Sequence, residues 1–172
     1  MLRPSLSSAA RKIAARVAGL LRVRWLVRAP IWLYRARLGM IFGSRLLLLE
    51  HTGRKTGATR YAVLEVLDHP RRDTYVVASG FGDQAQWFRN VRASPLVRVR
   101  VGSRRPAPAI ARHLNSEEAS ASLAAFAVAH PRAWGTLKPV LEATLGARIG
   151  DQGTDLPLVA LELQPQPGNA AR

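Results

Sequence analysis

Residues 45–79 read RLLLLEHTGRKTGATRYAVLEVLDHPRRDTYVVAS, and their pattern gives the clearest indication of the fold. Runs rich in apolar and β-branched residues predict three strands, over residues 45–51, 60–68 and 74–79. The segment TGRKTGAT separates the first two runs. HPRRD separates the last two, and we expect a turn built on Pro70 and Asp73 there. Two successive hairpins predict an antiparallel meander.

Beyond residue 79 the pattern alternates between helix and strand. Helical spacing of apolar residues predicts a helix over residues 84–93. Valine alternates with arginine over residues 97–101, which predicts a strand with one face in water. Residues 105–114 predict a further strand, which Pro106 and Pro108 would confine to an edge or a bulge.

The last third of the chain predicts a helical insert followed by a final strand. Asn115 and Glu118 have the spacing of a capping box, which would open a helix that runs through Ala129. Pro131 would start a second helix, closed by Gly146. Residues 156–163 predict the last strand. About six strands with interspersed helices predict an α+β domain whose sheet curls toward a barrel.

The N-terminal segment differs from this domain in charge. The first 49 residues contain ten basic residues and no acidic one. Residues 1–43 therefore predict basic amphipathic helices, followed by a barrel domain over residues 44–163 with a helical insert at about 115–147, and a flexible tail over residues 164–172. The N-terminal helices could lie on an anionic membrane surface, pack on the domain with their arginines in water, or form a transit peptide.

Composition narrows the classes of partner. Lys plus Arg total 26 against 11 Asp plus Glu, a formal charge of +15 that favours anionic partners, although the 23 arginines could equally reflect genome base composition. The chain has no cysteine, which excludes disulfides, thiolate metal sites and a thiol nucleophile. No apolar run is long enough to span a bilayer, and no signal peptide is apparent. We expect a cytoplasmic protein, with the inner face of the cell membrane as a second location that the N-terminal helices leave open.

The segment TGRKTG, residues 52–57, is the strongest candidate for a binding site. Its glycines would let backbone N–H groups approach an anion, and Thr52 and Thr56 offer hydroxyl donors. Arg54, Lys55 and Arg60 add positive charge suited to phosphate. The spacing matches neither a nucleotide P-loop nor the dinucleotide-binding pattern. Anion capture is one interpretation, and a solvated basic hairpin turn is the other.

The order TGRKTG, a β-hairpin, VVASG and then QWFRNVRASPLV resembles the deazaflavin-dependent nitroreductase family, whose members have an FMN-binding, split β-barrel-like fold. The resemblance covers about residues 45–113 and the last strand. It implies a reductase that takes a hydride from reduced coenzyme F-420, an 8-hydroxy-5-deazaflavin, and passes it to a quinone, nitro or similar electron-poor acceptor. Split barrels of this kind also resemble proteins that often form homodimers, and the sequence leaves the oligomeric state open between monomer and homodimer.

The resemblance also assigns roles to particular residues. Arg54, Lys55 and Arg60, within the loop of Thr52, Gly53, Thr56 and Gly57, would hold the phosphate and acidic tail of the cofactor. Val77, Ala78 and Ser79 would line its ring. Trp87 and Asn90 match the family's helix beside the cofactor, although Trp87 could be a core aromatic and Asn90 a structural hydrogen-bond partner. Phe88 stands where relatives often have tyrosine, so a hydroxyl contact is not expected there.

Other chemistry has weaker support. No pair of histidines has the spacing of a metal site, and Ser79 lacks the setting of a hydrolase nucleophile. No acid or base is evident, so the catalytic residues stay unassigned. His130 and Trp134 are candidates for a lid over the acceptor, and the alternative is that their two helices simply pack Leu123, Phe126, Leu137 and Leu141 onto the barrel.

Three alternative functions remain at this point. FMN also carries a phosphate and could use the same loop in a split-barrel reductase. A basic protein without catalysis could act at a membrane surface through the N-terminal helices. A nucleic-acid-binding module would fit the charge, but the chain has no recognised nucleic-acid motif, so we expect no specific nucleic-acid partner.

Overall fold

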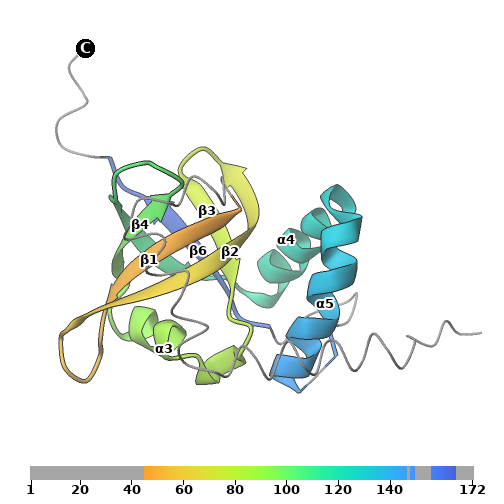
Figure 1. Ribbon diagram of the computed structural model, residues 1–172, viewed down its shortest axis with the longest axis horizontal. Coiled ribbons are helices and arrows are strands. Elements are labelled where there is room, and N and C mark those ends of the chain that lie inside the picture. Colours follow the sequence, from red (N-terminus) through yellow and green to blue (C-terminus); the bar gives the residue numbers. More distant parts are fainter. Residues whose placement is uncertain (1–44, 147, 150–155, 166–172) are drawn as a thin grey trace, which may run out of the picture.

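A computed structural model describes residues 45–146, 148–149 and 156–165 of the chain. Six antiparallel strands form a closed barrel in the order β1-β2-β3-β6-β5-β4 (Figure 1). The strands are β1 (Leu46–Thr52), β2 (Thr59–Arg71), β3 (Thr74–Ala78), β4 (Leu96–Val101), β5 (Ala107–His113) and β6 (Leu158–Leu163). The expected α+β fold with a curled antiparallel sheet is confirmed. The predicted N-terminal helices and most of the predicted tail lie outside the described residues.

Alternation of side chains along the strands separates the inside of the barrel from its outer wall. Leu47 and Leu49 of β1 are fully buried inside, with Val99 and Val101 of β4 beside them. The intervening Leu48 and Glu50 face the outer wall, as period-2 alternation requires. β1 and β4 pair through Leu47↔Val101 and Glu50↔Arg98, which closes the barrel.

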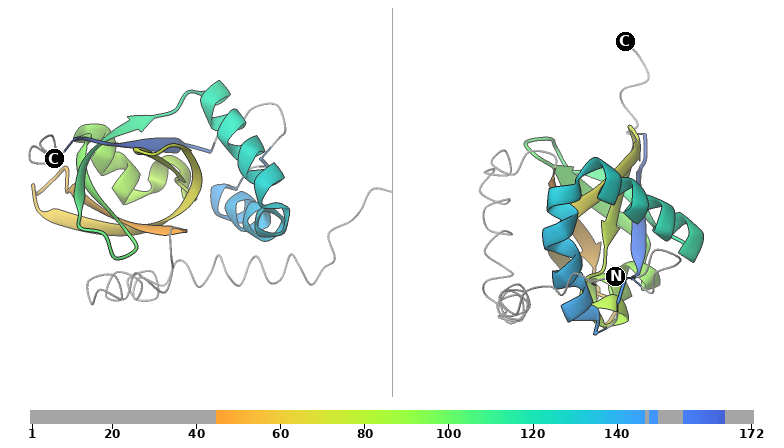
Figure 2. Two further views of the ribbon diagram at one scale, coloured as in Figure 1. Left: turned by 90° about the horizontal axis from the view of Figure 1, so that it is seen from above. Right: turned by 90° about the vertical axis from the view of Figure 1, so that its right-hand side faces the viewer.

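The helices cover two different parts of the barrel. After β3 the chain forms a 3-10 turn η2 (Gly82–Gln84) and then α3 (Gln86–Ala93), which lies across one end of the barrel and adds Phe88 and Val91 to its core (Figures 1 and 2). The pair α4 (Ser116–Ala129) and α5 (Pro131–Leu145) packs against the side of the barrel. There Leu123, Phe126 and Leu141 bury a second apolar cluster against Leu67 and Val76.

Two predictions about proline were wrong. Pro70 lies within β2 and not in the turn, because register shifts between Val66 and Arg71 accommodate it, and Arg72 and Asp73 form the turn alone. The strand after Pro106 is not an edge strand, since β5 pairs with both β4 and β6. Pro108 is tolerated there because pairing with β6 begins only at Ala109.

Candidate functional site

The loop between β1 and β2 extends from the end of the barrel that α3 covers (Figure 1). It is folded on itself: the N–H of Gly53 donates to the carbonyl of Ala58 at 2.8 Å, and the N–H of Gly57 donates to the carbonyl of Gly53 at 2.8 Å. Gly57 has φ of +67°, a conformation that side chains disfavour. A Cβ on Gly53 would lie 3.1 Å from the Ala58 carbonyl. The turn therefore favours glycine at both positions.

The loop presents its polar side chains to solvent. Thr52, Arg54, Lys55, Thr56 and Arg60 are all exposed. Two threonine hydroxyls and three cationic groups thus surround one short turn, and this set of donors suits phosphate and carboxylate groups. The structure thus leaves the predicted loop side chains exposed around one turn, and their role in binding a cofactor stays a prediction.

Helix α3 holds the loop through Asn90. The backbone N–H of Arg54 donates to Asn90 Oδ1 at 3.2 Å, and Arg54 Nη1 donates to the same oxygen at 2.9 Å. Arg54 Nη1 also donates to Gln86 Oε1, one helical turn earlier, at 3.1 Å. Arg54 and Asn90, which were predicted separately, are thus in direct contact. Gln86 was not predicted, and its spacing of four residues from Asn90 is the signal that places both on one face of α3.

His51 lies beneath the loop and was not predicted as a site residue. Its side chain is buried, and its Nδ1 lies 3.2 Å from Asn90 Nδ2. Burial lowers the pKa of His51 below its ordinary value of 6.5; the positive charge of Arg60 acts in the same direction, and a hydrogen bond with the backbone of Thr52 opposes both. The imidazole is therefore neutral at pH 7. The inward alternation of β1 is the sequence signal that could have identified it.

The residues expected to line a cofactor ring are largely enclosed. Val77 is fully buried in the core of the barrel, and Ala78 is half-buried. Ser79 is fully buried, and its hydroxyl donates to the carbonyl of Gly82 at 2.7 Å, so it fixes the turn that leads into η2. Trp87 is half-buried and packs edge-on to Phe88. The assignment of these four residues to the cofactor stays a prediction.

The proposed lid residues lie far from the loop. His130 and Trp134 belong to the junction and first turns of the α4–α5 pair, and both pack on Phe126 with ring centroids 5.2 and 6.2 Å apart. Figures 1 and 2 show this helix pair and the β1–β2 loop on opposite sides of the barrel. The structure thus does not bring these two residues to the loop, and the expected packing of the helix pair onto the barrel is observed.

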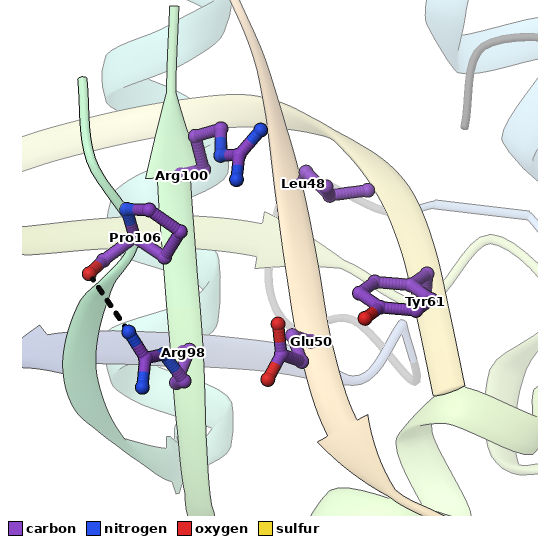
Figure 3. A pocket seen from close by; sticks show the side chains of 6 residues that line it. All are labelled: Leu48, Glu50, Tyr61, Arg98, Arg100 and Pro106. Carbon is purple, nitrogen blue, oxygen red and sulfur yellow. Dashed lines mark hydrogen bonds between the residues drawn. The ribbon is translucent and has the colours of Figure 1, made fainter. Parts of the chain in front are cut away.

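A separate hollow of about 180 Å³ opens on the outer wall of the barrel (Figure 3). Its lining combines apolar and charged side chains from β1, β2, β4 and the segment before β5: Leu48, Glu50, Tyr61, Arg98, Arg100 and Pro106. None of the predicted cofactor-binding residues lies in it. Among the described residues there is also no cluster of three side chains that could hold a metal ion, and no helix long and apolar enough to cross a membrane.

Comparison with known proteins identifies a family whose model matches this chain. Residues 26–137 match the family model described as F420H(2)-dependent quinone reductase. A Mycobacterium tuberculosis protein, whose name gives it as a candidate F420H(2)-dependent quinone reductase, is 40% identical over 67 residues. The alignment covers 37% of this chain and 56% of that protein, so the chain matches only about half of that relative's length.

Two solved structures, the first two described below, support the fold. A chain described as a domain-swapped dimer aligns with a TM-score of 0.50 and 22% identity, over 78% of this chain and 100% of its own. The Agrobacterium tumefaciens protein Atu2129, of unknown function, aligns with a TM-score of 0.52 and 15% identity, over 80% of this chain and 56% of its own. An F420-H2 dependent reductase aligns with a TM-score of 0.48 and 25% identity, over 69% of this chain and 94% of its own.

Proposed function

Because this chain belongs to the F420H(2)-dependent quinone reductase family, we propose that it is an F-420-dependent reductase with its cofactor site on the β1–β2 loop. The observation that carries the proposal is the loop itself, in which Arg54, Lys55 and Arg60 are exposed around one glycine turn that Asn90 holds in place. The phosphate and acidic tail of reduced coenzyme F-420 are complementary to these donors in charge.

The bound deazaflavin would supply the hydride, and the acceptor would be a quinone, a nitro compound or a similar electron-poor molecule. The residues of the chain would then bind and orient. Lys55 and Arg60 would neutralise the anionic tail, while Asn90 and Gln86 hold the Arg54 guanidinium against α3. Val77, Ala78, Ser79 and Trp87, at the same end of the barrel as α3, would support the ring and limit access of water. Positioning and electrostatics are the protein's share of such chemistry.

A cofactor titration tests this proposal. Purified protein is titrated in parallel with coenzyme F-420, FMN and NADPH. We expect tight binding of F-420 only, and Lys55→Ala should weaken it about tenfold through loss of one charge-assisted contact. Arg72→Ala is the matched control, since Arg72 is an exposed cation in the other hairpin turn. FMN binding with no F-420 binding would replace the proposal by the FMN alternative.

The acceptor is tested by steady-state reduction. Menadione and a nitroaromatic compound are offered with reduced F-420, and the values of kcat/KM are compared. We expect the quinone to be reduced faster, in accord with the family. A large preference for the nitroaromatic compound would assign the nitroreductase type instead.

The basic N-terminal segment suggests where the acceptor is met. It has ten basic and no acidic residues among its first 49, so we propose that it attaches the protein to anionic membranes, where lipid-soluble quinones reside. Flotation with anionic vesicles should recover the full chain, and replacing Arg22, Arg24 and Arg28 by glutamine should reduce that recovery. Equal flotation of both proteins would contradict the attachment. We also propose a homodimer, which sedimentation equilibrium would detect.

A further inference from the structure

We propose that His51 and Asn90 are positioning residues for the cofactor: they hold the β1–β2 loop in its binding geometry only while the His51 ring is neutral. This inference rests on the proposed function, since it concerns the same loop. It concerns three residues linked by successive hydrogen bonds: His51 in β1 contacts Asn90 in α3, and Asn90 contacts Arg54 in the loop.

The orientation of the Asn90 amide follows from its partners. Two donors from Arg54, its backbone N–H and its Nη1, converge on one side-chain atom of Asn90 at 3.2 and 2.9 Å. That atom must be the oxygen, because an amide nitrogen cannot accept. The Nδ2 group therefore faces His51 and donates to its Nδ1. The Nδ1 atom must be unprotonated for this bond to exist, so the neutral ring carries its proton on Nε2.

The charges around His51 favour this neutral ring. Arg60 is its register partner on β2, and Arg54 in the loop contacts the same Asn90 side chain that His51 contacts. Helix α3 presents the neutral Asn90, while Arg89 on the same helix donates to the backbone carbonyl of Asp83 and to Gln84 Oε1. On β1 and β4, Glu50 and Arg98 face the outer wall, where they line the hollow in Figure 3. The register partner Arg60 therefore adds positive charge beside His51, which disfavours a protonated ring.

Protonation would reverse the chain of hydrogen bonds. With a proton on Nδ1, the His51 N–H and the Asn90 Nδ2 group would both be donors and could not form a hydrogen bond. Asn90 would then have to turn its side-chain oxygen toward His51. The backbone N–H and guanidinium of Arg54 would then lose their shared acceptor. The loop would keep its own internal bonds but lose its attachment to α3, and Arg54 would no longer be fixed for an anion.

Simple electrostatics predicts the opposite pH dependence, which makes the inference testable. An anionic ligand beside an imidazolium would bind more tightly at low pH, whereas loss of the attachment makes it bind less tightly. Dissociation constants for coenzyme F-420 are measured from pH 7.5 to pH 5 for the wild type and for His51→Gln. The glutamine side chain of this variant cannot titrate, so the ratio of the two constants at each pH removes the titration of the cofactor itself.

As the pH falls, we expect the affinity of the wild type for coenzyme F-420 to decrease about tenfold more than that of His51→Gln. This is the effect expected for the loss of one charge-assisted hydrogen bond. His69→Gln is the control, because His69 lies at the β2–β3 hairpin and not beneath the loop. It should behave as the wild type. A ratio that stays constant, or that moves toward tighter wild-type binding at low pH, overturns the inference.

A second variant covers the case in which His51→Gln does not fold. In Asn90→Asp the carboxylate accepts from Arg54 whether or not His51 is protonated. This variant should bind coenzyme F-420 more weakly than the wild type at every pH, but its affinity should lack the additional decrease at low pH that the wild type shows relative to His51→Gln. Retention of the full wild-type slope would contradict the mechanism.

A measurement without cofactor separates this inference from the proposed function. Nitrogen NMR of the histidine rings should show His51 with Nδ1 unprotonated at pH 7, and the Arg54 amide resonance should shift as His51 titrates. If F-420 does not bind at any pH, the proposed function fails, but these two signals still decide the positioning role. An Nδ1–H ring, or an Arg54 amide that does not respond, refutes it.

Discussion

At the scale of single residues, the site depends on contacts between residues that are far apart in the sequence and meet only in the folded protein. Arg54, Lys55 and Arg60 could be nominated from sequence because glycines and cations crowd one short segment. Asn90 could be nominated only from the resemblance. His51 and Gln86 were missed, since His51 is 39 residues from Asn90 and their contact exists only because α3 folds back over the end of the barrel. A period-2 pattern predicts that His51 points inward but cannot name its partner.

The same histidine makes stability depend on pH. Its pKa is lowered in the folded protein, chiefly by burial, relative to its ordinary value of 6.5. Below that value the unfolded chain binds more protons than the folded one, so the free energy of unfolding should fall as the pH drops from 6.5 toward the lowered pKa. Above pH 6.5 the contribution is fully present. Urea unfolding at several pH values should show this decline in the wild type.

The control for this prediction is His51→Gln, in which the decline over that range should be smaller. Glu118 titrates in a separate range: hydrogen bonding to Arg112 lowers its pKa below 4.5, so its contribution is lost only at more acid pH. An identical decline in the variant and the wild type between pH 6.5 and 5 would assign the effect to other groups.

At the scale of elements, local signals predicted most of the strands and helices to within about two residues. The exceptions are informative. Pro70 and Pro108 were assigned to a turn and to an edge or bulge, because proline lacks the N–H that a central strand must donate. The structure accommodates Pro70 by register shifts in β2, and Pro108 by starting the β5–β6 pairing one residue later. Such adjustments depend on the partner strand and therefore have no local signature.

The start of α4 offers a prediction at this scale. Asn115 Oδ1 accepts from the Glu118 N–H at 2.9 Å, and Glu118 Oε2 accepts from the Asn115 N–H at 3.0 Å, which is a complete capping box. Asn115→Ala leaves the first-turn N–H groups to water and should lower the free energy of unfolding by about 1 kcal/mol. Asn115→Ser, which can still cap, is the matched control and should lose much less. Equal losses in the two variants would show that the cap is not the cause.

At the scale of the whole molecule, the order of the strands in the barrel could not be predicted from the sequence. The meander of β1, β2 and β3 follows from short connections, but β6 inserts between β3 and β5, and β4 returns to β1. These pairings join segments up to about ninety residues apart, as in Thr74↔Glu162. The closure is what sets α3 and the β1–β2 loop at the same end, so the site is a consequence of the topology and not of any one motif.

The net charge of +15 gives the last prediction, because a field of this size acts on every anion that approaches. Affinity for coenzyme F-420 should fall severalfold as the ionic strength rises from about 0.05 M to about 0.5 M, since salt screens exposed cations such as Lys55 and Arg60. If the loop supplies the contacts, Lys55→Ala should show a shallower salt dependence, while Arg72→Ala should keep the wild-type slope. Parallel slopes in all three proteins would mean that the overall charge, and not the loop, attracts the cofactor. A random DNA duplex serves as a reference ligand that responds to the overall charge. Its affinity should decrease with salt, and Lys55→Ala and Arg72→Ala should change that affinity by the same amount.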